Sequence, residues 1–240
     1  MISPQEQKLI IIAGCNGSGK TSLYQHLILQ RTKEFVDMPY INVDNIAREL
    51  SNKDDFTRFK EAGKIAILKK KEYFKEQKSF IQETTLCGHY PTAMIKEAIQ
   101  LGYKTEIHFI VVESKELAKK RIELRVLNGG HSVDAETVDK RYEESLQKIK
   151  SLLPLIDETF FYDNTHEIQN VAYFQKDECV FICQTTPLWF KEKINFLIDN
   201  DKKQDKNINT KTYEKVKPEG LVRPFFDNTK SSHKIKQLNK

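Results

Sequence analysis

The sequence predicts an α/β fold in which a parallel sheet is flanked by helices. Three observations carry this prediction. The apolar run at residues 9–13 is typical of a buried strand, and it leads through a glycine-rich loop into a helix-like segment. Strand-like and helix-like segments then alternate as far as residue 163, which is the order that crossover helices between parallel strands produce. The chain has 240 residues, of which 39% are hydrophobic, and this is enough to bury one core.

The glycine-rich loop at residues 14–21 is a complete G-x-x-x-x-G-K-[ST] phosphate-binding motif between a strand and a helix. Its glycines let the backbone turn tightly and point N–H groups at phosphate oxygens, next to the positive end of the helix dipole. Lys20 is expected to reach the β- and γ-phosphates, and the Thr21 hydroxyl is expected to bind the metal ion. We therefore expect a P-loop NTPase-type sheet with ATP and Mg²⁺ as cofactors. The expected nucleotide-binding residues are Gly14, Cys15, Asn16, Gly17, Ser18, Gly19, Lys20, Thr21 and Ser22.

The elements that follow the first helix are predicted from apolar periodicity and from the breaks in it. A short second strand is expected at 39–43, ending at Asp44, and a helix is expected from about Asn45. The next elements are a long charged helix at 54–77, a strand at 79–83, a helix at 91–101 and a strand at 104–112.

A helical lid is expected at about 121–141, around the Asn128-Gly129-Gly130-His131 break. Ser114 can cap the helix before the break. A second helix is expected at about 134–151. The apolar residues expected to face inward are Leu117, Ala118, Ile122 and Val126 on the first helix, and Val138, Tyr142, Leu146 and Ile149 on the second.

A C-terminal extension at about 169–199 is expected to follow the last core strand, at 160–163. Its two strand-like runs, 169–175 and 178–184, are joined by a two-residue turn and predict a β-hairpin. A final helix is expected at 187–198.

The chain is expected to divide into a P-loop domain at 1–200 and a basic, flexible tail at 201–240. The tail contains 11 Lys/Arg and 5 Asp/Glu, whereas residues 1–200 contain 28 and 29, so the net charge of +5 comes from the tail. Nucleic acid is therefore not an expected partner, except through the tail. An apolar island at 221–226 is expected to pack on its own domain, with docking of a partner as the alternative.

A cytoplasmic location is expected, without a membrane partner. No apolar run approaches the roughly 20 residues that a membrane helix needs, and the first residues lack the order of a signal peptide. The four cysteines fit a reducing compartment.

Two carboxylates follow or end strands at the sheet edge where ligands bind in open parallel sheets. Asp44 can accept the proton of a substrate hydroxyl or help to bind Mg²⁺, and it can also cap the helix that begins near Asn45. Glu83 precedes two threonines, and this pattern suits hydrogen bonds to a polyol, sugar or ribose. An exposed turn residue is the alternative interpretation of Glu83.

A basic cluster spans the expected lid. Arg121 and Arg125 lie one helical turn apart, and Arg141 follows the diglycine. In small phosphotransferases such arginines neutralise charge on the transferring phosphoryl group while water is excluded. The alternative is a solvated helix pair with surface ion pairs.

Two other function classes remain open at this point. An ATP-hydrolysing regulator would use Glu113, after the strand at 104–112, to activate water. A polynucleotide 5′-hydroxyl kinase would use the basic tail to hold nucleic acid. No motor-type signature is present.

Several segments between residues 8 and 165 together form a more specific pattern than the phosphate loop alone. The most specific is Arg125-Val126-x-x-Gly129-Gly130-His131-x-Val133, followed by Lys140-Arg141-Tyr142-x-x-Ser145-Leu146. The others are Ala13 to Ser22, Ile41 to Ala47, Gln82 to Leu86, Gly102 to Lys104 and Tyr162 to Asn164. This pattern resembles the zeta toxin family of P-loop kinases and the wider group of zeta-like proteins.

The resemblance implies ATP-dependent phosphorylation of a hydroxyl on a small molecule, in the first place UDP-N-acetylglucosamine. An antitoxin-like protein is a candidate partner by the same resemblance. Two departures are Cys87, where the toxins carry an arginine, and Cys15, which replaces a common proline. The implied catalytic residues are Asp44 as general base, Lys20, and Arg121 or Arg125 facing the transferring phosphate. The implied substrate-binding residues are Asp44, Glu83, Thr85, His131 and Arg141.

Overall fold

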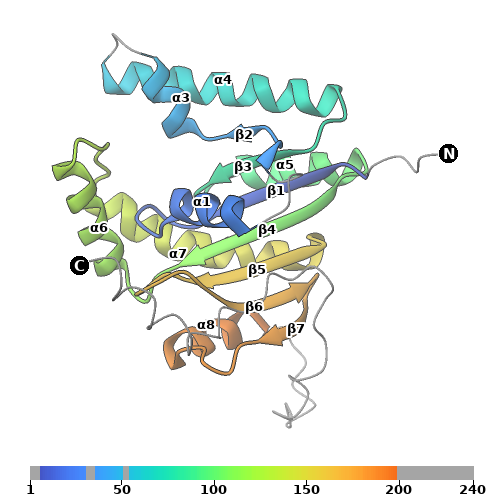
Figure 1. Cartoon of the computed structure of the whole chain (residues 1–240), viewed down its shortest axis with the longest axis vertical. Coiled ribbons are helices and arrows are strands. Elements are labelled where there is room, and N and C mark those ends of the chain that lie inside the picture. The colour runs from blue at the N-terminus through green and yellow to red at the C-terminus, as the bar shows by residue number, and fades with distance from the viewer. Residues whose placement is uncertain (1–5, 31–35, 51–53, 199–240) are drawn as a thin grey trace, which may run out of the picture.

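The computed structural model describes residues 6–30, 36–50 and 54–198 (Figure 1). Within this part of the chain, seven strands form one sheet in the order β2-β3-β1-β4-β5-β6-β7. The neighbouring strands from β2 to β5 are parallel, and β6 and β7 are antiparallel additions at one edge. The strands are β1 Lys8–Ala13, β2 Tyr40–Ile41, β3 Phe80–Thr84, β4 Lys104–Val111, β5 Glu158–Asp163, β6 Gln169–Gln175 and β7 Glu178–Ile182. The expected mostly parallel α/β fold is confirmed.

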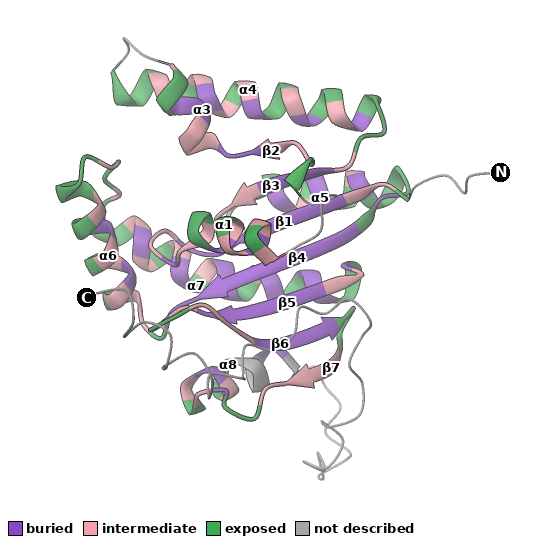
Figure 2. Cartoon of the chain, in the orientation of Figure 1, coloured by how far each residue is buried: buried purple, intermediate pink, exposed green. Residues whose placement is uncertain are grey.

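Helices lie on both faces of the sheet, as crossover connections require. In Figure 1, α1 lies in front of β1, whereas α5 and α7 lie behind the sheet. The strands between them are the most buried part of the molecule (Figure 2), because they carry apolar side chains on both faces of the sheet. The helices are α1 Lys20–Gln30, α3 Val43–Glu49, α4 Asp55–Lys75, α5 Tyr90–Gln100, α6 Lys115–Leu127, α7 Ala135–Leu152 and α8 Leu188–Ile198.

Polar side chains fix where several helices begin. Ser114 accepts a hydrogen bond from the Leu117 N–H at 3.2 Å, as the sequence predicted for α6. Asp134 caps α7 in the same way, with 2.7 Å to the Thr137 N–H. The apolar stripe predicted for α7 is buried at Val138, Tyr142, Leu146 and Ile149. On α6, Ala118 and Ile122 are buried, but the prediction for Val126 is wrong, because this side chain is 38% exposed near the end of the helix.

The second strand and its helix differ from the prediction in a way that matters for the site. β2 is only Tyr40–Ile41, and α3 already begins at Val43. Asn42 is the cap, since its side chain accepts from the Asn45 N–H at 3.0 Å. Asp44 therefore lies in the first turn of α3 and does not end the strand or cap the helix.

The predicted hairpin and final helix extend the sheet beyond β5. β6 and β7 pair across Gln175 and Glu178, and Phe190 of α8 packs edge-on against Phe161 of β5 with 6.4 Å between ring centroids. The tail at 201–240, including the island at 221–226, lies outside the described residues. No helix in the described part of the chain is both long and apolar enough to cross a membrane.

Candidate functional site

A cavity of about 980 Å³ opens at the carboxyl ends of β1 and β3, where the sequence placed its candidate residues. Its walls are the phosphate loop, the start of α3, one side of α4, the end of β3 and the lid formed by α6 and α7. All of the expected catalytic and substrate-binding residues line it: Lys20, Asp44, Glu83, Thr85, Arg121, Arg125, His131 and Arg141. Such a volume is at the upper end of small-molecule sites and leaves room for a nucleotide and a second ligand.

The phosphate loop is held open by close packing against its neighbours. Gly17 and Gly19 have φ angles of +79° and +99°, which side chains other than glycine rarely adopt. A Cβ at Gly19 would come within 2.2 Å of Asn164 Nδ2, an atom that donates to the Ser18 carbonyl at 2.8 Å. The Lys20 ammonium donates to the Cys15 carbonyl at 3.0 Å and so folds back along the loop.

The nine expected nucleotide-binding residues divide into two groups. The side chains of Ser18 and Cys15 are buried beneath the loop, and Gly14 packs against the Ile110 carbonyl. These three residues do not line the cavity, so Ser18 and Cys15 can offer a nucleotide only their backbone groups. The residues that do line the cavity are Asn16, Gly17, Gly19, Lys20, Thr21 and Ser22.

Burial makes Cys15 an unreactive thiol. Desolvation raises the pKa of its thiol to about 11 from an ordinary value of 9.0, so it is neutral at pH 7. We expect iodoacetamide to label Cys15 more slowly than half-buried Cys183 at pH 7.5, because Cys15 is buried and its thiolate fraction is about 100-fold below that of a thiol with the ordinary pKa of 9.0. The Cys15 rate should keep rising with pH up to about 11. Peptide mass spectrometry of the labelled native protein measures both sites, and equal labelling would contradict the burial of Cys15.

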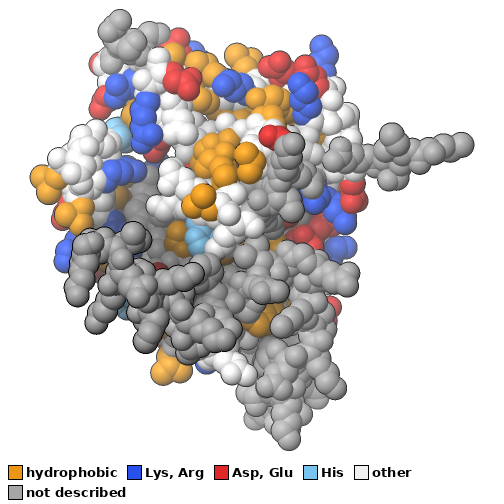
Figure 3. Space-filling model, in the orientation of Figure 1, with side chains coloured by type: hydrophobic (Ala, Val, Ile, Leu, Met, Phe, Trp, Pro, Cys, Tyr) orange, Lys and Arg blue, Asp and Glu red, His pale blue; other side chains and the backbone are white. Residues whose placement is uncertain are grey.

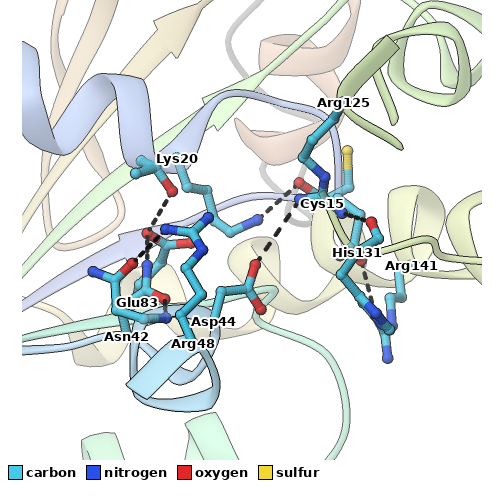
Figure 4. Close-up of polar contacts among 12 residues, drawn as sticks. Cys15, Lys20, Asn42, Asp44, Arg48, Glu83, Arg125, His131 and Arg141 are labelled. Carbon is cyan, nitrogen blue, oxygen red and sulfur yellow. Dashed lines mark hydrogen bonds and ion pairs between the residues drawn. The ribbon is translucent and has the colours of Figure 1, made fainter. Parts of the chain in front are cut away.

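Three donors converge on one oxygen of Glu83. Asn42 Nδ2 lies 2.7 Å from Glu83 Oε2, Thr21 Oγ1 lies 3.3 Å from it, and the Tyr40 hydroxyl also donates to it. Burial and the Glu83 carboxylate raise the pKa of Tyr40 far above its ordinary value, so Tyr40 keeps its proton and remains a donor. Glu83 is thus a fixed carboxylate at the end of β3 and not a loose turn residue (Figure 4). Tyr40 and Asn42 were not among the predicted site residues.

Arg125 is positioned by the diglycine that ends α6. The Gly130 N–H donates to the Arg125 carbonyl at 2.9 Å, and a Cβ at Gly130 would come within 2.5 Å of Arg125 Cγ. The His131 carbonyl accepts from Arg125 Nη2 at 2.6 Å, and Nη1 lies 3.9 Å from Asp44 Oδ2. Arg125 Nε is buried and has no hydrogen-bond acceptor among the described residues. The lid therefore presents a guanidinium directly to Asp44 (Figure 4).

The other basic residues of the lid have different partners. Arg121 Nη2 donates to the Thr165 carbonyl at 3.2 Å, and Arg141 Nη1 donates to Asn16 Oδ1 in the phosphate loop at 2.8 Å. The His131 ring lies over Phe59 of α4, with 4.2 Å between ring centroids, and so closes the lid against that helix. The three arginines thus lie around the phosphate loop and Asp44 in three separate positions.

Two oxygen ligands of the kind that Mg²⁺ prefers lie next to each other in the cavity. Among the described residues, no group of three or more His, Cys, Asp or Glu side chains is placed to hold a metal ion. A Mg²⁺ ion that arrives with a nucleotide needs only one or two carboxylates, because phosphates and waters supply the other ligands. The Thr21 hydroxyl and the Glu83 carboxylate fit this requirement.

Comparison with known proteins decides the family. A model of the zeta toxin family matches residues 2–186. The chain belongs to the zeta toxin family. Membership of this family, together with the P-loop kinase fold, supports a nucleotide-dependent, kinase-like function.

Relatives of this zeta toxin family protein are distant in sequence. An uncharacterized protein of Haemophilus influenzae is 29% identical over 137 residues, which are 57% of this chain and 94% of the relative. The AvrRxo1-ORF1:-ORF2 complex aligns with a TM-score of 0.60 and 16% identity over 78% of this chain and 63% of that chain. That complex has also been solved with ATP.

The PezAT chromosomal toxin–antitoxin system of Streptococcus pneumoniae aligns with a TM-score of 0.50 and 20% identity. The alignment covers 68% of this chain and 71% of that chain. At these identities the solved structures establish the fold that they share with this zeta toxin family protein.

The structure also shows where Cys87, Glu113 and several residues of α4 lie relative to the cavity. Cys87, which stands where the toxins carry an arginine, does not line the cavity, and its thiol donates to the Thr85 and Arg141 carbonyls at 3.3 and 3.5 Å. Glu113, the base that an ATP-hydrolysing regulator would use, is exposed and also lies outside the cavity. The α4 residues Phe59, Lys60, Gly63 and Lys64 line the cavity but were not predicted, since the sequence showed only a charged helix there.

Proposed function

We propose that this protein is an ATP-dependent kinase that phosphorylates a hydroxyl of a small molecule, with UDP-N-acetylglucosamine as the first acceptor to test. The observation that supports this proposal most is the pairing of Asp44 with Arg125 across the cavity, 3.9 Å apart, beside the phosphate loop. A base for the hydroxyl proton and a cation for the phosphoryl group are the two parts that phosphoryl transfer requires next to bound ATP.

In the proposed reaction, Asp44 accepts the proton of the acceptor hydroxyl as the hydroxyl oxygen attacks the γ-phosphorus. A new O–P bond forms, the bond from the γ-phosphorus to the β–γ bridging oxygen breaks, and ADP leaves. Arg125 and Lys20 stabilise the negative charge on the transferring group. Mg²⁺, bound by Thr21 and Glu83 together with the phosphates, would neutralise phosphate charge and orient the γ-phosphate.

The lid residues have distinct proposed roles. Arg141 holds Asn16 and so keeps the phosphate loop in shape, and Arg121 braces α6 against the Thr165 carbonyl. Glu83 and Thr85 contact the acceptor from the end of β3, and His131 closes the lid over it. We propose Arg125, and not Arg121, as the arginine at the transferring phosphate, because only Arg125 has a described contact with Asp44.

Mass spectrometry of candidate acceptors incubated with protein and Mg²⁺-ATP tests the function. The panel contains UDP-N-acetylglucosamine, sugar phosphates, uncharged sugars and nucleosides. A mass gain of one phosphate on one acceptor, absent without Mg²⁺, supports the kinase. Release of ADP without any phosphorylated acceptor would favour an ATP-hydrolysing regulator instead.

An antitoxin-like protein is the proposed macromolecular partner. The supporting observations are the family of this chain and the toxin–antitoxin system among its structural neighbours. We also propose a kinase domain at 1–200, a tail at 201–240 and a cytoplasmic location.

A further inference from the structure

A row of aromatic side chains crosses the sheet on the side that carries α1. His108 of β4 stacks on Phe160 of β5 with 4.9 Å between ring centroids, and Phe160 stacks on Tyr173 of β6 with 4.8 Å. Phe181 of β7 lies opposite Tyr173 in the register and packs against the same apolar cluster. The aromatic row, His108, Phe160, Tyr173 and Phe181, therefore runs from the middle of the sheet to the edge strand β7.

The described helices cover little of the aromatic row. Helices α3 to α8 bury their apolar residues in the cluster on the other side of the sheet. Only α1 joins the cluster of the aromatic row, through Leu23 and Leu27, and its main strand contacts are with β1. Figure 3 shows this side of the molecule, where apolar side chains gather around α1. Phe160 and Tyr173 are nevertheless buried, so the row needs a further segment over it.

Two carboxylates lie beside the aromatic row. Glu106 and Glu158 are register partners on β4 and β5. Glu106 Oε1 lies 2.5 Å from His108 Nε2, and the Tyr173 hydroxyl donates to Glu158 Oε1 at 3.0 Å. Burial and the Glu158 carboxylate raise the pKa of Tyr173 to about 12, so Tyr173 keeps its proton as the donor. Like charges on neighbouring strands are unfavourable, and this side of the sheet suits a segment with aromatic and cationic side chains.

The chain beyond α8 contains a segment of this kind. Its sequence is Leu221-Val222-Arg223-Pro224-Phe225-Phe226, within a tail that has 11 Lys/Arg against 5 Asp/Glu. The described part of the chain ends at residue 198 in α8, which lies next to β6 and β7 in Figure 1. The 22 residues at 199–220 can span about 70 Å when extended, and a domain of this size is only about 40 Å across. The segment can therefore pass around β7 to the α1 side.

We propose that residues 221–226 bind across the aromatic row on the α1 side of the sheet. Phe225 and Phe226 pack on the rings of Phe160 and Tyr173, and Arg223 pairs with the Glu158 carboxylate. The contact lies within one chain and is independent of the kinase function proposed above.

The proposed contact also completes the core beneath the phosphate loop. Ile110 of β4 belongs to the same cluster as the aromatic row. Its carbonyl and side chain lie against Gly14, and its side chain also lies near Gly19. The segment therefore supports the strand on which the phosphate loop packs.

Photo-cross-linking tests the position of the segment. The photoreactive residue p-benzoylphenylalanine replaces Phe226 in the full chain, and mass spectrometry identifies the cross-linked peptides. We expect cross-links within one chain to peptides of β4, β5 and β6. The same residue at Ile235, outside the segment, is the control and should give less than about a tenth of these cross-links. Equal cross-linking from the two positions would overturn the proposal.

Other occupants of the aromatic row give different cross-links. A mixture of isotopically light and heavy protein distinguishes contacts within one chain from contacts between copies. Mixed light–heavy products from position 226 would show a second copy on the row and would overturn the proposal. Cross-links from position 226 mainly to α4 or to the phosphate loop would also overturn it.

The double variant Phe225→Ser/Phe226→Ser tests the apolar contact. We expect it to lower the Tm by at least about 5 °C, because the aromatic row loses the rings that cover it. The matched control is Ile235→Ser/Leu238→Ser, which removes two apolar side chains of the tail outside the segment. This control should change the Tm by less than about 1 °C. Equal Tm values for the two double variants would overturn the apolar contact.

Charge reversal tests the pairing of Arg223 with Glu158. Arg223→Glu and Glu158→Lys should each lower the Tm by about 2 °C, and their combination should restore at least half of the summed loss. Such a restoration requires that the two side chains lie close together. Lys230→Glu combined with Glu158→Lys is the control and should restore nothing. Additive losses in Arg223→Glu/Glu158→Lys would overturn the charge contact.

Discussion

Replacing Asp44 with asparagine is expected to lower kcat for phosphate transfer by about 10²–10⁴-fold. Asparagine keeps the shape of the side chain at the start of α3 but cannot accept the hydroxyl proton. The affinity for ATP should change less than threefold, since Asp44 lies outside the phosphate loop and Asn42 makes the cap of α3. Steady-state assays of the phosphorylated acceptor, together with nucleotide binding by calorimetry, measure the two quantities.

The control for Asp44→Asn is Asp177→Asn, which removes an exposed carboxylate at the turn between β6 and β7. This variant should retain wild-type kcat. An Asp44→Asn enzyme with more than a tenth of the wild-type kcat would show that another group, or the substrate itself, accepts the proton.

Replacing Arg125 with alanine is expected to lower kcat by at least about 10³-fold, the lower end of what an arginine contributes to phosphoryl transfer. The guanidinium is held by the His131 carbonyl and faces Asp44, and its buried Nε lacks an acceptor among the described residues. The side chain lines the cavity and is 36% exposed, so a phosphoryl oxygen can reach the guanidinium from the cavity. Lysine at this position should restore only part of the rate, because it lacks the planar, forked donors of arginine.

The comparison with Arg121→Ala decides which lid arginine acts on the phosphate. Arg121 donates to the Thr165 carbonyl, so Arg121→Ala should lower kcat less than Arg125→Ala does. Lys120→Ala, an exposed residue on the same helix and outside the cavity, is the control and should behave like the wild type. A larger loss in Arg121→Ala than in Arg125→Ala would reverse the assignment.

Much of the fold could be predicted because its signals are local. The apolar strands, the Ser114 cap, the α7 stripe and the hairpin each depend on residues close together in the sequence. The second strand was less predictable, since β2 has only two residues and its boundary depends on the Asn42 cap. Val126 was misplaced because it lies one residue before the end of α6, where the chain turns at the diglycine and no further helical turn follows.

The site was predictable only where a short sequence motif is by itself typical of one chemical function. The phosphate loop is such a motif, because glycine conformations and a following helix are properties of one short segment. The environment of Glu83 is not, since its donors come from β2, the residue after β2, and α1. The side of α4 that lines the cavity could not be predicted either, because the sequence of a charged helix does not indicate which side faces a cavity.

The sequence alone determined the P-loop, the alternation of strands and helices, and the lid with its diglycine, for these depend on backbone geometry and apolar periodicity within short segments. Only the tertiary structure decided which charged and polar groups lie next to one another. It set Arg125 against Asp44, fixed Glu83 with three donors and placed one side of α4 in the cavity wall. The reason is that electrostatic and hydrogen-bond contacts depend on distances of a few ångströms between segments that lie far apart in the chain.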